Sequence, residues 1–373
     1  MKNSAKEPGK RVYSLDALRG ADMFWIMGGE HIFHALAKLT GWGVFVWMAH
    51  QLEHTKWDGF TFYDMIFPLF LFIAGVSMPY SLNKRIDRGD SRAQIYRHVV
   101  QRMLLLVFFG MVYNGFLKFD WENMRYASVL ARIGLGWFFA ALIFLNFNRR
   151  GQAIWFVGTL IAYWLIMTFI PVPGYGAGDL SMEGSLVAYI DRLLLPGRLY
   201  LGVHDPEGIL STLPAVSTAL MGVLTGNFLR DERQGLTKLR KGLMLGAAGL
   251  VFLLLGYLWG LFFPINKNLW TSSFVLYTGG WSLIFLSIFY LIIDVWEKKR
   301  WAFAFVVIGL NPITIYLAQG GIISFEQASD FFFGGLISYF SEAAQPVLEA
   351  IGYTFISWLF LYFLYRQKIF LRV

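Results

Sequence analysis

One histidine of this sequence lies among the groups that proton transfer requires. Three carboxylates and an indole stand within ten residues of His54: Glu53, Asp58 and Asp64, with Trp57 between them. Imidazole is the side chain that most often moves protons near neutral pH, and a neighbouring carboxylate can orient its ring and stabilise its charged form. We therefore expect His54 to be catalytic and Asp64 to hold it in place.

Asp64 also interrupts the hydropathy pattern. It falls within the first turns of an apolar segment, residues 60–82, that is long enough to cross a bilayer. An ionisable group inside such a segment is costly and is therefore a candidate for function by default. The alternative is structural, because the positive end of a helix dipole also favours an acidic residue at this position.

The connection at residues 263–273, FPINKNLWTSS, has the composition of a sugar-binding site. Its amides, amine and indole suit a sugar, which presents hydroxyl groups on its edges and an apolar face that stacks on aromatic rings. We expect Lys267 and Trp270 to bind substrate. Asn268 is expected to be catalytic, polarising the carbonyl that reacts, as oxyanion-hole donors do.

Acidic residues at other segment ends extend the expected substrate site. Residues 203–214, VHDPEGILSTLP, contribute Asp205 and Glu207, although carboxylates in such a place can simply cap the next helix. Glu30 follows two glycines near the end of the first apolar segment and can face the same side as His54. With these three residues we group three from the His54 loop: Glu53, Trp57 and Asp58.

His31 and His34, beside Glu30, also resemble part of a metal site. A metal centre requires a second set of well-spaced ligands, and the chain has no cysteine that could supply thiolates. We therefore expect no metal.

Charged residues inside two other apolar segments are candidates for holding a ligand. Asp16, Arg19 and Asp22 recur at a spacing of three, which places them on one helical stripe. They can form an internal ion pair that orients the helix, or they can bind a ligand directly. Arg132, alone in segment 127–146, needs an anion, either a neighbour such as Asp22 or a ligand phosphate. Arg19 and Arg132 are therefore the expected contacts to a phosphate-bearing donor.

The elements that position these residues must be membrane-spanning helices. Of the 373 residues, 57% are hydrophobic and 15% are charged, against about 25% charged in soluble domains, and the mean hydropathy is +0.52. The sequence predicts an all-α polytopic membrane protein with about ten spans, and an eleventh is left open. The expected spans are residues 15–37, 60–82, 99–117, 127–146, 152–170, 209–229, 242–262, 271–293, 302–323 and 347–365.

The basic residues predict how these spans cross the membrane. With a cytoplasmic N-terminus, 23 of the 32 lysines and arginines fall on the inner side and seven on the outer side, as the positive-inside rule requires. We expect one transmembrane domain, residues 14–366, with cytoplasmic tails at 1–13 and 367–373. His54 then faces outward, and residues 324–346 are expected to form an interfacial helix on the same side. Topology thus accounts for the net charge of +8, and nothing indicates a nucleic-acid partner.

Five motifs in a fixed order resemble those of a known family. They are SLDALRG, HTKWDGFTFYDMIFPLFLFIAGVS, DPEGILSTLPA, FPINKNLWTSS and LNPITIY, and they extend over residues 14–316. This pattern is similar to the heparan-α-glucosaminide N-acetyltransferase family, and most similar to its bacterial members of Bacteroidetes type within the wider transmembrane acyltransferase superfamily. The resemblance implies a multi-pass enzyme that moves the acetyl group of cytosolic acetyl-CoA across the membrane to the amine of a glucosamine.

The resemblance also implies roles for individual residues. The family's loop motif H-x-x-W-N-G corresponds to residues 54–59, HTKWDG, so the catalytic role falls on His54, and the aspartate of its A-D-L-V-F-P segment corresponds to Asp64. Two positions depart from the pattern. Asp58 replaces the asparagine of the motif, and Glu30 stands where those relatives have an asparagine at the end of the preceding helix.

The sequence therefore predicts an acetyl-CoA-dependent N-acetyltransferase of the bacterial inner membrane, with an amino sugar as acceptor on the periplasmic side. His54 acts as a general base or, by an alternative route, carries the acetyl group itself. Two other functions stay open: an amino-sugar transporter, and an O-acyltransferase of a cell-surface glycan. The sequence also leaves open whether the protein is a homodimer.

Overall fold

The structure, a computed structural model, describes residues 12–371, and its regular secondary structure is almost entirely helical. The predicted tail 1–13 lies almost wholly outside the described residues, as do residues 372 and 373. Eight described helices are long and apolar enough to cross a membrane, or up to nine if the bent pair Arg300–Gly309 and Pro312–Ile322 counts as one span. The eight comprise α5 (Arg92–Tyr113), α6 (Val129–Asn146), α7 (Arg149–Phe169), α9 (Thr212–Leu229), α10 (Lys238–Gly260), α15 (Gln345–Arg366), and α4 (Ile66–Asp87) and α11 (Ser272–Tyr290), each with a short helical extension.

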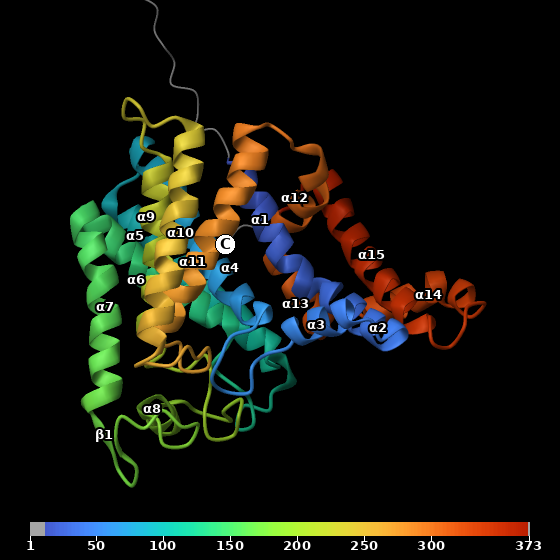
Figure 1. Cartoon of the computed structure of the whole chain (residues 1–373), viewed down its shortest axis with the longest axis horizontal. Helices are drawn as coiled ribbons and strands as arrows, with labels where there is room; N and C mark the ends of the chain where they lie inside the picture. Colours follow the sequence, from blue (N-terminus) through green and yellow to red (C-terminus); the bar gives the residue numbers. More distant parts are fainter. Residues whose placement is uncertain (1–11, 372–373) are drawn as a thin grey trace, which may run out of the picture.

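The structure confirms the all-α polytopic class, and nine of the ten expected spans correspond to these helices and the bent pair. The segment expected at 15–37 differs, because it is broken. Helix α1 (Tyr13–Phe24) runs into a π-helical turn, Trp25–Gly29, and the chain then turns into α2 (Glu30–Thr40). Gly28 has φ 142° within that turn, a conformation open to glycine alone. Helices α2 and α3 (Gly43–Gln51) extend sideways from α1 (Figure 1).

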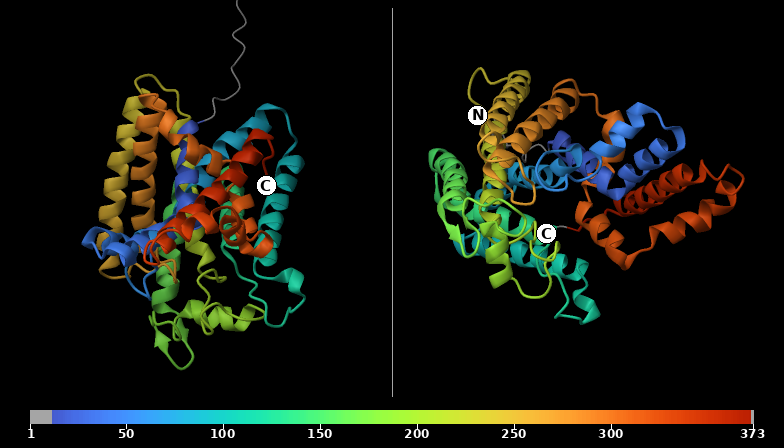
Figure 2. Two further views of the ribbon diagram at one scale, coloured as in Figure 1. Left: turned by 90° about the vertical axis from the view of Figure 1, so that its right-hand side faces the viewer. Right: turned by 60° about the horizontal axis from the view of Figure 1, so that its bottom comes forward.

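Helices α4 and α9 form the centre of the bundle, and small residues let them approach closely. A Cβ atom on Gly75 would lie 2.2 Å from the Ala219 carbonyl oxygen, and one on Gly222 would lie 2.1 Å from that of Phe72. Only glycine allows the two backbones to come so near, as is common where membrane helices pack. Helices α10 and α11 lie side by side, while α6 and α7 pack against α9 (Figures 1 and 2).

The connections expected on the outer side gather at one end of the bundle, which we call the loop-rich end (Figure 1). It carries the His54 loop, the segment before α11, and residues 171–211 with the short strands β1 (Pro171–Val172) and β2 (Gly176–Ala177) and helix α8 (Leu186–Leu194). Helix α14 (Phe325–Ile337) falls within the interfacial helix expected at 324–346, and it runs across the direction of the long helices (Figure 1).

The chain after α15 returns to the bundle instead of extending away from it. The Asn311 side chain donates to the Ile369 carbonyl (2.8 Å) and accepts from the Leu371 amide (3.0 Å). Asn311 lies in the bend between α12 (Phe303–Gly309) and α13 (Pro312–Leu317), and its side chain is buried. The LNPITIY motif therefore fixes the C-terminal segment 369–371 against the broken span.

Candidate active site

His54 and Asp64 are in direct contact at the loop-rich end. The Asp64 Oδ1 atom lies 2.8 Å from His54 Nδ1, and the aspartate is fully buried while half of the histidine side chain is exposed. Thr61 and Asp64 form a capping box at the start of the helical turn before α4, which fixes the carboxylate. The Thr55 hydroxyl also donates to Asp64 Oδ2 (3.1 Å). A rigid, buried acceptor therefore orients the imidazole through Nδ1 and leaves Nε2 free of the carboxylate.

Lys267, which is far from His54 in the sequence, contacts the same imidazole. Its Nζ atom is 2.9 Å from His54 Nε2, 3.0 Å from His54 Nδ1 and 3.7 Å from Asp64 Oδ1. Burial lowers the pKa of Lys267, and the nearby carboxylates Asp64 and Glu207 oppose this shift only in part. The arrangement places an amine, an imidazole and a carboxylate in mutual contact, which is a set able to move protons.

These groups line a cavity of about 480 Å³ that we call the histidine cavity. Its polar wall is at the loop-rich end and its deeper wall is apolar. The polar lining comprises His54, Thr55, Lys56, Tyr63, Asp64, Tyr113, Arg125, Tyr200, Glu207, Lys267, Asn268 and Tyr316. Lys267 and Asn268 therefore join His54 and Asp64, as the sequence predicted. The sequence analysis missed seven members: Thr55, Lys56, Tyr63, Tyr113, Arg125, Tyr200 and Tyr316.

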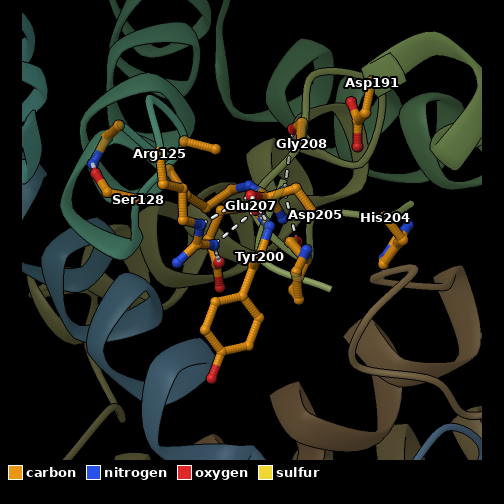
Figure 3. Close-up of polar contacts among 12 residues, drawn as sticks. Arg125, Ser128, Asp191, Tyr200, His204, Asp205, Glu207 and Gly208 are labelled. Carbon is orange, nitrogen blue, oxygen red and sulfur yellow. Dashed lines mark hydrogen bonds and ion pairs between the residues drawn. The ribbon is translucent and has the colours of Figure 1, made fainter. Parts of the chain in front are cut away.

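An ion-pair network fixes one wall of the histidine cavity (Figure 3). Arg125 makes two hydrogen bonds to Asp205, at 2.8 and 2.6 Å, and a third to Glu207. Burial opposes the charge of Arg125, but its hydrogen bond with Asp205 and the attraction of Glu207 raise the pKa of the guanidinium above its usual value. Asp205 is buried and does not line the cavity, so Glu207 is the carboxylate that this network presents to it.

A second cavity, of about 560 Å³, lies on the other side of the first one's apolar wall. We call it the arginine cavity, because Arg19 and Arg102 line it together with Lys84, Tyr80 and Ser77. The two cavities share five lining residues: Phe70, Leu130, Ile133, Pro312 and Ile313. They therefore meet at one apolar wall between α4, α6 and α13.

Arg19 and Arg102 have different environments in the arginine cavity. Arg19 donates to the Ser77 hydroxyl (3.0 Å) and forms an ion pair with Asp16 (3.4 Å). The Arg102 guanidinium lies over the Trp137 ring at 4.1 Å, and no atom of the described residues accepts from its buried Nε. The sequence analysis did not single out Arg102. Its position well inside α5, followed by an apolar run, is the signal that marks it as an ionisable group within a span.

Arg132 lines neither cavity. Its Nη2 donates to two backbone carbonyls, of Pro206 (2.9 Å) and Gly208 (3.1 Å), and to the Ser211 hydroxyl (2.6 Å). The guanidinium lies 5.2 Å from the Trp270 ring, and both side chains are buried. The two residues brace the loop that carries Asp205 and Glu207, so neutral oxygens bind Arg132 where the sequence led us to expect an anion.

Other predicted substrate residues tie the loops together. The Trp57 indole donates to the Leu180 carbonyl (3.0 Å), and the Asp58 carboxylate accepts from the Asn266 side chain (3.0 Å). Neither residue lines the histidine cavity, and Glu53 is exposed outside it. These contacts hold the His54 loop against the segment that carries Lys267. Trp57 and Asp58 therefore position the His54 loop and do not line the cavity.

Glu30 reaches the site through Tyr63. Its carboxylate lies near the Tyr63 hydroxyl, and the Tyr63 ring lies 4.8 Å from that of His54. The neighbouring His31 Nε2 is 3.9 Å from Glu30 Oε1. Within residues 12–371 no group of three or more His, Asp or Glu side chains is arranged to hold a metal ion.

His204 supports Asn268 from behind the site and gives the fold a testable response to pH. Its Nε2 lies 3.0 Å from the Asn268 carbonyl oxygen, so the neutral ring donates there. Burial lowers the pKa of His204 to about 4 from the usual 6.5. The unfolded chain therefore takes up a proton at higher pH than the folded chain, and stability is lost as the pH falls from 6.5 to about 4.

We expect His204→Gln to weaken this pH dependence while retaining a donor to Asn268. The wild-type protein should lose up to about 3 kcal/mol of unfolding free energy through this group over that interval, and the variant should lose less. Thermal unfolding in detergent across the interval measures both. Equal pH dependence in the two proteins would contradict a buried, neutral His204.

Comparisons with known proteins extend the resemblance carried by the motifs. Residues 11–116 match a family model described as a domain of unknown function, DUF5009. The heparan-alpha-glucosaminide N-acetyltransferase of Mus musculus is 29% identical over 378 residues, and that of Homo sapiens is 28% identical; both alignments cover 86% of this chain and 56% of the relative. The chain thus spans about half the length of these curated relatives. These alignments confirm the resemblance: the chain is similar to the heparan-alpha-glucosaminide N-acetyltransferases over most of its own length.

Proposed function

We propose that the protein is an acetyltransferase of the bacterial inner membrane. It takes the acetyl group of cytoplasmic acetyl-CoA and transfers it to the amine of a glucosamine-type sugar on the periplasmic side. One observation carries the proposal: a cavity lined by arginines and a cavity with a histidine–aspartate pair meet at a single apolar wall. The similarity to N-acetyltransferases supports the same reaction.

The arginine cavity has the chemistry of the donor site. Arg19 and Arg102 are suited to the phosphates of CoA, because guanidinium groups bind phosphate with paired hydrogen bonds, and Lys84 adds a third positive charge. The long pantetheine arm would then pass the apolar wall at Leu130 and Ile133. The thioester at its end would enter the histidine cavity.

The histidine cavity has the groups for the transfer itself. His54 accepts a proton from the acceptor amine through Nε2, while Asp64 accepts from Nδ1–H and stabilises the imidazolium. Asn268, at the cavity wall, donates to the thioester carbonyl as negative charge develops on it. In an alternative route the imidazole attacks first and carries the acetyl group to the sugar.

The acceptor binds on the polar side of the same cavity. Glu207, fixed there by Arg125, offers a negative charge to the ammonium group of an amino sugar. Lys56, Tyr200 and Lys267 offer donors to its hydroxyl groups. An acceptor that presents only hydroxyl groups would make the protein an O-acyltransferase with the same donor site.

Two cavities that meet inside the membrane also suit a transporter, and one experiment separates the two functions. Purified protein is given acetyl-CoA and glucosamine while free CoA and the mass of the sugar are followed. We expect CoA release only when the acceptor is present, with a gain of one acetyl group on the sugar. A transporter would instead exchange labelled sugar across vesicle membranes without any CoA.

A further inference from the structure

Lys267 is held against the catalytic imidazole by a rigid turn. Its neighbour Asn266 accepts from the Leu269 amide (2.8 Å) and donates to Asp58 (3.0 Å), and Trp270 closes the turn with φ 53°. The Lys267 side chain is only 14% exposed. The fold therefore fixes the position of this amine, unlike that of an exposed lysine, whose side chain is mobile.

The ammonium is closer to His54 than to the buried carboxylate. Its Nζ lies 2.9 Å from Nε2 but 3.7 Å from Asp64 Oδ1, and Asp64 already accepts from His54 and Thr55. A simple ion pair with Asp64 would favour the reverse order of distances. Nζ is also 3.0 Å from Nδ1, so the amine lies beside both ring nitrogens. Because Nδ1 bonds to Asp64, Nε2 is the ring nitrogen left to exchange a proton with the amine.

Acetyl transfer requires both a base and an acid at this place. The acceptor nitrogen must lose a proton as the new C–N bond forms, and the sulfur must gain one as the C–S bond breaks. His54 supplies the base, and the reaction proposed above leaves the acid unassigned. The Lys267 amine, 2.9 Å from His54 Nε2, is close enough to exchange a proton with this base.

We propose, on the basis of that acetyltransferase function, that Lys267 is a second proton-transfer group. Its ammonium protonates the CoA sulfur as the C–S electron pair moves onto it, and the resulting neutral amine takes up the proton that His54 Nε2 removed from the acceptor nitrogen. The proton thus passes from nitrogen to sulfur, and both side chains return to their starting forms.

The environment of Lys267 suits this role. Its lowered pKa, caused by burial against the opposing attraction of Asp64 and Glu207, makes the neutral amine accessible during turnover. The other groups near it are the imidazole of His54 and the hydroxyl-bearing wall of the histidine cavity. The other charged side chains that line the same cavity are Lys56, Arg125 and Glu207.

Three substitutions test the proposal on the purified full chain. Lys267→Arg keeps the positive charge but cannot release its proton at any working pH. Lys267→Ala removes both the charge and the transferable proton. Lys38→Ala removes an exposed lysine of α2 and serves as a control. We expect both Lys267 variants to lose at least about 10-fold in kcat with KM for acetyl-CoA nearly unchanged, and the control to match the wild type. Methylamine should restore part of the sugar acetylation by Lys267→Ala, measured by mass.

The pH profile gives a second readout. The alkaline limb of kcat should lie below pH 10.5, the usual lysine pKa, in the wild type and vanish in Lys267→Arg. Wild-type kcat and pH profile in Lys267→Arg would overturn the proposal, since charge alone would then suffice; so would a failure of methylamine to raise the rate of Lys267→Ala. If the wild type itself forms no acetylated sugar, the proposed function fails, and this role falls with it.

Discussion

Replacement of His54 by alanine is expected to lower acetyl transfer by at least about 100-fold and to leave acetyl-CoA binding intact. The imidazole is the only group in the described histidine cavity with a ring nitrogen held by a buried carboxylate. Its removal leaves the acceptor amine without a base. In the proposed mechanism the donor is bound mainly by the arginine cavity, which His54 does not line.

His50 provides a matched control for this variant. It is exposed on α3 and does not line either cavity, so His50→Ala should transfer acetyl groups at the wild-type rate. Free CoA release and the mass of the sugar measure the rate, and equilibrium binding of labelled acetyl-CoA shows that the donor site is preserved. Turnover by His54→Ala at the rate of His50→Ala would remove His54 from the mechanism.

A substitution that blocks the passage between the two cavities is expected to lower acetyl transfer by a comparable factor. Leu130 is buried and lines both cavities, so the larger indole of Leu130→Trp would occupy the path of the pantetheine arm. We expect acetyl transfer to fall by at least about 100-fold, because the thioester can no longer reach His54. The matched variant Leu130→Ala widens the same wall and should keep most of the activity.

Binding measurements distinguish a closed path from a damaged donor site. Adenosine 3′,5′-bisphosphate lacks the arm, so Leu130→Trp should bind it as the wild type does while its affinity for acetyl-CoA falls. The unfolding temperature reports the cost of overpacking, about 1–3 kcal/mol. Full activity of a folded Leu130→Trp protein would mean that the donor does not pass between Phe70, Leu130 and Ile133.

The local part of the site could be predicted from the sequence because its residues are neighbours in the chain. His54 and Asp64 are ten residues apart, and Thr61 with Asp64 forms a capping box whose signature is visible in the sequence. The contact between His54 and Lys267 joins residues 213 positions apart. The sequence indicated that both lie on one side of the membrane, but only the packing of α4 beside α11 brings them together.

Roles assigned by residue type were less reliable than roles assigned by location. Trp57 and Asp58 have the chemistry of sugar contacts, yet their polar atoms bond to Leu180 and Asn266. Arg132 has the chemistry of a phosphate ligand, yet carbonyl oxygens of residues 206 and 208 bind it. Side-chain direction depends on tertiary packing, which hydropathy and spacing do not contain.

The apolar composition predicted where the helices lie, but it did not predict where they are broken or bent. A window of apolar residues predicts a span, and it did so for α4 and α10. The break at Gly28 depends on a positive φ and a π-helical turn, and the bend of 59° at Asn311 depends on the following proline. Both breaks border the cavities, where interrupted helices make room for a ligand.

In the proposed mechanism the donor and the acceptor meet from opposite sides of the membrane. Vesicles that contain acetyl-CoA and hold the protein in their membrane are given glucosamine outside, with vesicles of the His54→Ala protein as the control. Acetylated sugar should appear outside while free CoA accumulates inside. Acetylation only when both substrates are placed on the same side would contradict transfer across the membrane.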